Sequence, residues 1–171
     1  MDFKKYIRNI PDFPIKGILF RDITTLLKDQ AAFKSALDKL YKVTSHYKAD
    51  KIAAIESRGY IFASVIAYKM GAGFIPIRKP GKLPAATIKR SYKLEYGTNE
   101  LEIHKDALVK GEHVILIDDL LATGGTAAAS VELIEALGGT VSAIIFLIEL
   151  ADLEGRKLIS NYNVHSLISY P

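Results

Sequence analysis

Four short, almost uninterrupted apolar runs constrain the fold of this chain more than any other feature. They cover residues 51–56 (KIAAIE), 73–78 (GFIPIR), 113–118 (HVILID) and 141–148 (VSAIIFLI). Runs without polar alternation are typical of strands that are buried on both faces. Helical patterns at 60–70 and 126–137 lie between them, and Gly138 and Gly139 close the second one. This alternation predicts an α/β fold with a central, mainly parallel sheet flanked by helices.

The rest of the chain predicts four further elements. Apolar spacing up to Pro11 favours a short N-terminal amphipathic helix, with apolar positions at Phe3, Tyr6, Ile7 and Ile10. Asp29 is a candidate N-cap of a longer helix, whose buried stripe contains Phe33, Ala36, Leu37, Leu40 and Val43 or Thr44. Alternating residues on either side of 97–99 predict a hairpin within 91–104, and a strand is expected at 164–168.

Length and composition restrict the class of protein. The 171 residues are close to one ordinary domain, so we expect a single domain over 1–171. The absence of cysteine excludes disulfides, thiol catalysis and Cys-ligated zinc. The longest apolar stretch, at 141–150, is well short of the about 20 residues that a membrane helix needs, and residues 1–5 lack the apolar segment of a signal peptide. We therefore expect a soluble, cytoplasmic protein without a membrane partner.

The positive charge of the chain is concentrated in one segment. The formal net charge of the chain is +4. The segment 78–93 contains six cations and no acid, and the cations are Arg78, Lys79, Lys82, Lys89, Arg90 and Lys93. The remainder has 17 cations against 19 acids and is slightly negative. One local basic segment suits a small polyanionic substrate better than a nucleic-acid duplex, so no nucleic-acid partner is expected. An ordinary solvated loop is the alternative explanation.

The strongest chemical signal is the segment 114–127 (VILIDDLLATGGTA). Asp118 and Asp119 end a predicted strand, a Gly-Thr loop follows and a helix begins, which is where open α/β sheets bind ligands. The loop offers backbone N–H groups and hydroxyls for an anion, from Ala122, Thr123, Gly124, Gly125 and Thr126. It lacks both the lysine of a nucleoside-triphosphate loop and a G-x-G-x-x-G pattern, which favours a phosphate monoester.

The two acids repel phosphate, so they require a different ligand group. Hydroxyls of a ribose can donate hydrogen bonds to Asp118 and Asp119 while the attached 5′-phosphate lies in the loop. The alternative is that both are ordinary strand-end and helix-capping acids.

This segment resembles the phosphoribosyl-pyrophosphate motif of the type I phosphoribosyltransferases. Residues 17–24 (GILFRDIT) resemble the F-R-D-I-T segment of adenine phosphoribosyltransferases, and 81–97, from GKLP to LEYG, resemble their mobile loop. Together with 57–59 (SRG) and 149–150 (EL), the resemblance covers nearly the whole chain. The chain departs from the family pattern at 85–86 and 88–90, which leaves the dynamics of the loop open.

The resemblance implies a type I phosphoribosyltransferase fold with a hood segment at 1–28 and a mobile loop and hairpin, or lid, at 78–104. It also implies a pentosyltransferase of purine salvage that converts adenine and phosphoribosyl pyrophosphate to AMP and pyrophosphate. The reaction would depend on Mg²⁺ that is held mainly by the substrate, with no protein ligand assigned. A homodimer is the usual assembly in the family.

The candidate site residues fall into three groups. Pyrophosphate is expected at a cradle and a set of cations, namely Ser57, Arg58, Gly59, Arg78, Lys79 and Lys82. Asp118 and Asp119 are expected to stabilise the cation that develops on the ribose as its bond breaks. By resemblance, Phe20 and Leu150 enclose the purine, the backbone of Leu19 and Arg21 reads its edge, and Glu95 manages the proton at N7. Judged by residue type alone, Phe20 and Leu150 are core residues and Glu95 is a solvated hairpin residue.

Two other functions compete with this prediction. A phosphoribosyltransferase for hypoxanthine, guanine or xanthine is disfavoured by the F-R-D-I-T segment. A non-catalytic sensor of phosphoribosyl pyrophosphate is disfavoured because only about 28 residues precede the first long helix, which leaves little room for a DNA-binding segment.

The histidines lack metal-ligand or triad spacing and are expected to be structural.

Overall fold

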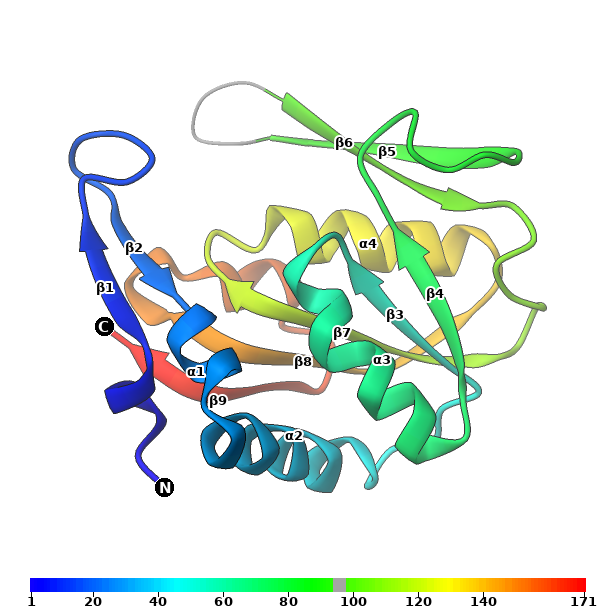
Figure 1. The fold of residues 1–171 in the computed structure, drawn as a ribbon. Helices are drawn as coiled ribbons and strands as arrows, with labels where there is room; N and C mark the ends of the chain where they lie inside the picture. Colours follow the sequence, from blue (N-terminus) through cyan, green and yellow to red (C-terminus); the bar gives the residue numbers. More distant parts are fainter. Residues whose placement is uncertain (94–97) are drawn as a thin grey trace. The chain divides into compact units, whose positions relative to one another are not determined.

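The central sheet has five strands, all parallel, in the order β4-β3-β7-β8-β9 (Figure 1). The computed structural model describes residues 1–93 and 98–171, and the sheet lies in the compact unit Leu40–Pro171. Its strands are β3 (Lys51–Ile55), β4 (Gly73–Ile77), β7 (His113–Leu121), β8 (Thr140–Leu150) and β9 (Val164–Tyr170). The α/β class and all five predicted strands are confirmed.

Strand β7 is longer than its apolar run predicts. It pairs with β8 through Leu120↔Ile148 and Leu121↔Glu149, so Asp118 and Asp119 lie within the strand and not at its end. The two acids break the apolar pattern, but backbone pairing with the long strand β8 does not depend on side-chain polarity. Both carboxylates are therefore fixed on regular backbone.

Two helices cover the sheet. Helices α3 (Arg58–Met70) and α4 (Gly125–Ala136) lie on opposite faces of it (Figure 1). Alternate strand residues such as Val114 and Leu116 share one hydrophobic cluster with residues of α4, as period-two alternation requires. Within the described residues, no helix is long and apolar enough to cross a membrane.

An antiparallel hairpin adjoins α4. Strand β5 (Thr87–Lys93) pairs with β6 (Thr98–His104), so the predicted hairpin is confirmed but begins earlier than residue 91. Thr98 and Asn99, predicted in its turn, instead lie in β6 opposite Lys93 and Tyr92. Leu101 and Ile103 anchor β6 in the same hydrophobic cluster as Val114 and Leu116. Two short 3₁₀ helices that the sequence patterns did not predict, η2 (Ala151–Leu153) and η3 (Gly155–Ile159), connect β8 to β9.

Residues Met1–Lys39 form a separate compact unit. It contains η1 (Phe3–Tyr6), β1 (Arg8–Pro11), β2 (Leu19–Asp22), α1 (Thr24–Lys28) and the start of α2 (Gln30–Thr44). The N-cap prediction is confirmed, because Asp29 Oδ1 accepts a hydrogen bond from the backbone N–H of Ala32 at 2.9 Å. The single-domain organisation and the hood function of residues 1–28 stay predictions.

The predicted N-terminal helix is wrong beyond Tyr6. After η1 the chain becomes strand β1, which pairs with β2 from Arg8↔Asp22 to Pro11↔Leu19. An ion pair between the Arg8 and Asp22 side chains accompanies the pairing. Apolar spacing in so short a segment fits a helical turn and a strand equally well, and the pairing with β2 decides between them.

Candidate active site

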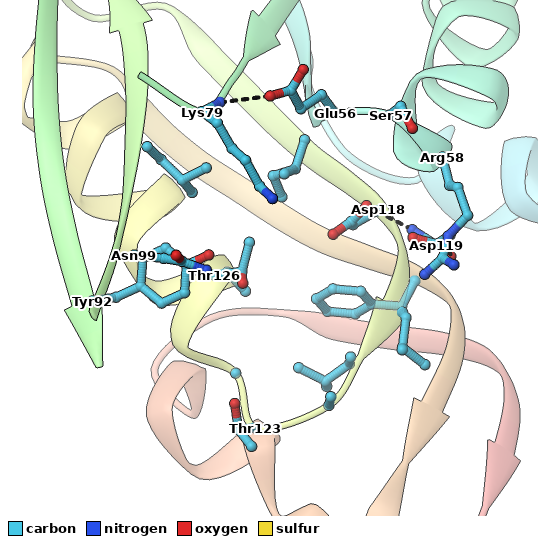
Figure 2. A pocket seen from close by; sticks show the side chains of 18 residues that line it. Glu56, Ser57, Arg58, Lys79, Tyr92, Asn99, Asp118, Asp119, Thr123 and Thr126 are labelled. Carbon is cyan, nitrogen blue, oxygen red and sulfur yellow. Dashed lines mark hydrogen bonds and ion pairs between the residues drawn. The ribbon is translucent and has the colours of Figure 1, made fainter. Parts of the chain in front are cut away.

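A cavity of about 460 Å³ opens where β3 and β7 end (Figure 2). This is the carboxyl edge of the parallel sheet, where open α/β folds bind ligands. Its lining combines residues from β3, the start of α3, the hairpin, β7, the start of α4 and β8. They are Ile55, Glu56, Ser57, Arg58, Lys79, Tyr92, Asn99, Leu101, Asp118, Asp119, Leu120, Leu121, Ala122, Thr123, Gly124, Thr126, Ala127 and Phe146.

The acid pair lies on β7, beside the start of α3. The Asp118 side chain accepts a hydrogen bond from the backbone N–H of Asp119 at 2.9 Å, and Asp119 forms an ion pair with Arg58. Burial raises the pKa of Asp118 well above its usual range, and the neighbouring Asp119 charge raises it further. Burial also raises the pKa of Asp119, but Arg58 opposes this effect. The cavity therefore holds two buried carboxyl groups whose pKa values are both raised.

Gly59 permits the close approach of α3 to this pair. A methyl group at Gly59 would lie 2.6 Å from Asp118 Oδ1 and 3.1 Å from the carbonyl oxygen of Ile117. Side-chain carbon atoms do not approach other atoms this closely without displacing them. The glycine of the 57–59 segment is thus required to pack the helix start against the acid-bearing strand.

The Gly-Thr loop connects β7 to α4 along one side of the cavity. Gly124 adopts a left-handed conformation with φ of 84°, and α4 begins at the next residue. The first turn of a helix exposes backbone N–H groups and carries a partial positive charge. Thr123 and Thr126 also line the cavity (Figure 2). The loop is therefore equipped to bind an anion with N–H groups and hydroxyls together.

A buried glutamate organises the cations on the other side of the cavity. Glu56, whose side chain is only 8% exposed, accepts hydrogen bonds from the Lys79 backbone N–H at 2.8 Å and from Arg78 Nε at 2.9 Å. Lys82 Nζ lies 3.2 Å from the same carboxylate. Burial raises the pKa of Glu56, but these three partners outweigh it and lower the pKa. The sequence prediction named the cations and missed the residue that holds them.

The hairpin contributes two further lining residues that sequence reasoning missed. Tyr92 on β5 and Asn99 on β6 are opposite each other in the ladder, and both line the cavity (Figure 2). The available signal was an aromatic residue within the basic segment 78–93 and an amide residue in the predicted hairpin. Neither residue type indicates a binding role without the tertiary contact.

Comparison with known proteins decides the family. Residues 22–169 match the phosphoribosyl transferase domain. The adenine phosphoribosyltransferase of Caldanaerobacter subterraneus subsp. tengcongensis is 54% identical over 169 residues, which cover 99% of this chain and 98% of that protein. This chain belongs to the adenine phosphoribosyltransferase family.

Solved structures of adenine phosphoribosyltransferases have the same fold. The enzyme of Thermoanaerobacter pseudethanolicus superimposes with a TM-score of 0.96 at 54% identity, covering 99% of this chain and 98% of that one. The enzyme of Saccharomyces cerevisiae superimposes with a TM-score of 0.90 at 38% identity, over 97% of this chain and 96% of that one. The predicted type I phosphoribosyltransferase fold is confirmed.

The cavity brings together most, but not all, of the residues assigned from the sequence. Those in the lining are Ser57, Arg58, Lys79, Asp118, Asp119, Ala122, Thr123, Gly124 and Thr126. Gly59, Gly125, Arg78 and Lys82, all within the described part of the chain, are not among its lining residues. Leu150 ends β8 outside that lining as well.

The remaining assigned residues stay predictions of the family resemblance. Leu19, Phe20 and Arg21 form part of β2 in the unit Met1–Lys39, where the rings of Phe13 and Phe20 are 5.1 Å apart, centre to centre. Glu95 lies outside the described residues. Among the residues that the structure does describe, no group of three or more His, Cys, Asp or Glu side chains is arranged to hold a metal ion.

Proposed function

We propose that this protein transfers the phosphoribosyl group of phosphoribosyl pyrophosphate to adenine, releasing pyrophosphate and forming AMP. The observation that carries the proposal is the meeting of an acid pair, a Gly-Thr anion loop and a cation cluster around one cavity. Each matches one part of the substrate: the ribose, the 5′-phosphate and the diphosphate. The structure of the yeast enzyme contains adenine and an iminoaltritol bisphosphate. These ligands support the proposal that the present chain binds adenine together with a phosphorylated sugar.

The sugar is proposed to lie with its 5′-phosphate toward the Gly-Thr loop and its diphosphate toward the cations around Glu56. The 5′-phosphate accepts hydrogen bonds from the start of α4 and from Thr123 and Thr126. The ribose hydroxyls donate to Asp118 and Asp119. As the bond at the anomeric carbon breaks, positive charge develops on the sugar, and the nearby carboxylates stabilise it.

The diphosphate is proposed to lie toward Ser57, Arg58 and Lys79. Arg78 and Lys82 are held nearby through their contacts with the Glu56 carboxylate. Fixed cations stabilise negative charge on the departing pyrophosphate more than on the substrate, because the charge increases as the bond breaks. Glu56 keeps Arg78 and Lys82 in place before the substrate arrives.

Mg²⁺ fits this arrangement as a partner of the substrate. The carboxylates of Asp118 and Asp119 are hard oxygen donors beside the proposed ribose, and Mg²⁺ in proteins commonly combines one or two carboxylates with water and substrate phosphates. When bound, the ion would neutralise the diphosphate. Asp118 and Asp119 are the residues that would hold it, directly or through water.

As the family resemblance implies, the proposed adenine contacts are the side chains of Phe20 and Leu150 and the backbone of Leu19 and Arg21. Glu95 is the proposed partner of N7. A homodimer and a cytoplasmic location complete the proposal and rest on the family resemblance. Sedimentation of the purified protein tests the assembly.

A product assay with each purine base tests the function. Purified protein is mixed with phosphoribosyl pyrophosphate, Mg²⁺ and adenine, hypoxanthine, guanine or xanthine, and nucleotide is separated and quantified. AMP as the dominant product is expected. A preference for another base would assign a different purine substrate, and tight binding of phosphoribosyl pyrophosphate without any nucleotide product would indicate a sensor.

A further inference from the structure

Two glycines meet backbone to backbone where the Gly-Thr loop passes η3. A methyl group on Gly155 would lie 2.7 Å from the Gly124 nitrogen and 2.8 Å from the Thr123 carbonyl carbon, and would collide with the Ala122 carbonyl oxygen. A methyl group on Gly124 would in turn lie 2.9 Å from the Gly155 carbonyl carbon. All of these neighbours are main-chain atoms, which cannot rotate away as a side chain does. The loop can therefore occupy its position only if residue 155 has no side chain.

The segment that bears Gly155 is itself firmly held. Arg156 Nε donates to Glu149 Oε1 at 2.9 Å, and Arg156 Nη1 donates to the Val164 carbonyl oxygen at 2.7 Å. Ile159, at the other end of η3, is 1% exposed and belongs to the same hydrophobic cluster as Val114 and Leu116. Because both ends of η3 are anchored to the sheet and the core, Gly155 is a fixed support and the loop must fit against it.

The contact falls on the atoms that the proposed phosphate site uses. Gly124 precedes α4, and its nitrogen belongs to the group of N–H donors at the helix start. A displacement of the loop backbone by a few tenths of an ångström changes the distance and angle of several such donors together. Hydrogen bonds weaken steeply when their geometry departs from the optimum.

We propose that Gly155 is a positioning residue for the 5′-phosphate. It does not touch the substrate, and it acts by setting the backbone of Ala122, Thr123 and Gly124. Arg156 and Glu149 are the support that holds Gly155 in place. This inference rests on the proposed function, because it assumes that the loop binds the 5′-phosphate.

The test compares two ligands that probe opposite ends of the cavity. Binding of ribose 5-phosphate and of pyrophosphate with Mg²⁺ is measured by calorimetry for the wild type and for Gly155→Ala. The dissociation constant for ribose 5-phosphate is expected to rise about tenfold to a hundredfold, as for the loss of one hydrogen bond to a charged group. The dissociation constant for pyrophosphate is expected to change less than twofold, since the cations around Glu56 do not contact Gly155.

Gly139→Ala is the matched control. A methyl group there would lie 2.9 Å from Ile134 Cγ2 and 3.1 Å from Leu108 Cδ2, so it is also crowded, but it lies beyond the far end of α4. Gly139→Ala is expected to lower the melting temperature and to leave both dissociation constants unchanged. Selective loss of ribose 5-phosphate binding in Gly155→Ala alone supports the proposal.

Arg156→Lys keeps the inference testable if Gly155→Ala does not fold. Lysine retains the positive charge but cannot bond to Glu149 with two nitrogens and also to Val164. A smaller, equally selective weakening of ribose 5-phosphate binding is expected. Unchanged binding, or equal weakening of both ligands, in the variant that folds overturns the positioning role.

The wild-type measurement separates this inference from the function on which it rests. Wild-type protein that binds no ribose 5-phosphate overturns the proposed phosphate site, and this inference with it. Wild-type binding that survives Gly155→Ala overturns the inference alone.

Discussion

The Arg58 guanidinium contacts the Asp119 carboxylate, with Nε 2.6 Å from Oδ2. This ion pair joins the first residue of α3 to the acid-bearing strand β7 and places a cation next to one member of the acid pair. Arg58 thereby opposes the rise in the pKa of Asp119, while the pKa of Asp118 is raised well above its usual range. Burial thus raises the pKa of both aspartates, and the Arg58 charge opposes this rise.

Asp118→Asn and Asp119→Asn should each reduce kcat/KM by up to about 2–4 kcal/mol of transition-state stabilisation, because both carboxylates are proposed to stabilise the developing ribose cation. Both variants should fold, since asparagine keeps the shape of the side chain and the Arg58 side chain is 35% exposed and can be hydrated. Steady-state kinetics and thermal unfolding provide the measurements. Activity near that of the wild type in both variants would contradict the ribose assignment.

The free energy of unfolding should depend on pH through Asp118. Because folding raises its pKa above 3.8, the native state binds a proton that the unfolded chain has already released. The free energy of unfolding must then fall as the pH rises from about 4 toward the raised native pKa. Urea unfolding between pH 4 and pH 8 should show the wild type losing stability relative to Asp118→Asn. A difference that stays constant over this range would disagree with the raised pKa.

Asp22 should have the opposite effect. A backbone hydrogen bond from Thr24 and the contact with Arg8 outweigh burial and lower the pKa of Asp22 from 3.8 to about 2. The stabilisation is present above the unfolded value and is lost as the pH falls toward 2. The advantage of the wild type over Asp22→Asn in urea unfolding should narrow below pH 4. Arg8→Gln should retain part of this pH dependence, because the backbone hydrogen bond from Thr24, the largest cause that lowers the pKa, remains.

The basic segment 78–93 should exchange its amide hydrogens faster without substrate than with phosphoribosyl pyrophosphate and Mg²⁺. Its polar anchors are Glu56 and Glu102: Glu102 accepts a hydrogen bond from the Gly81 N–H at 3.1 Å and lies 2.9 Å from Lys89 Nζ. Glu102→Gln should therefore increase exchange at Gly81 in the free protein. Equal protection of the segment from hydrogen exchange with and without substrate would show that the predicted lid does not close over the ligand.

Glu95→Gln should lower kcat by about 10²–10⁴, because glutamine keeps the volume of the side chain but cannot take or give the proton at adenine N7. KM should change much less. The measurement is the pH dependence of kcat for both proteins. Full kcat across the pH range would make Glu95 an ordinary hairpin residue and would leave the N7 proton to water or to a backbone group.

Much of the fold could be predicted because its signals are local. An unbroken apolar run such as 113–118 requires a strand covered on both faces, and the helical spacing and glycine stop at 126–139 define the helix that follows. The segment from Asp118 to Thr126 likewise identified the acids and the anion loop, since this chemistry is contiguous in the chain. The N-terminal helix failed because a few apolar residues fit two structures, and the pairing of β1 with β2 decided between them.

The sequence by itself determined the five strands of the central sheet, the position of the Gly-Thr loop and the family. Tertiary structure alone decided which distant residues support them: Glu56 beneath Arg78 and Lys82, Tyr92 and Asn99 in the cavity, and Gly155 against Gly124. These relationships have no periodicity and no motif, because each depends on where two separate segments of backbone meet. A glycine that leaves room for another main chain is, in the sequence, indistinguishable from a glycine in any turn.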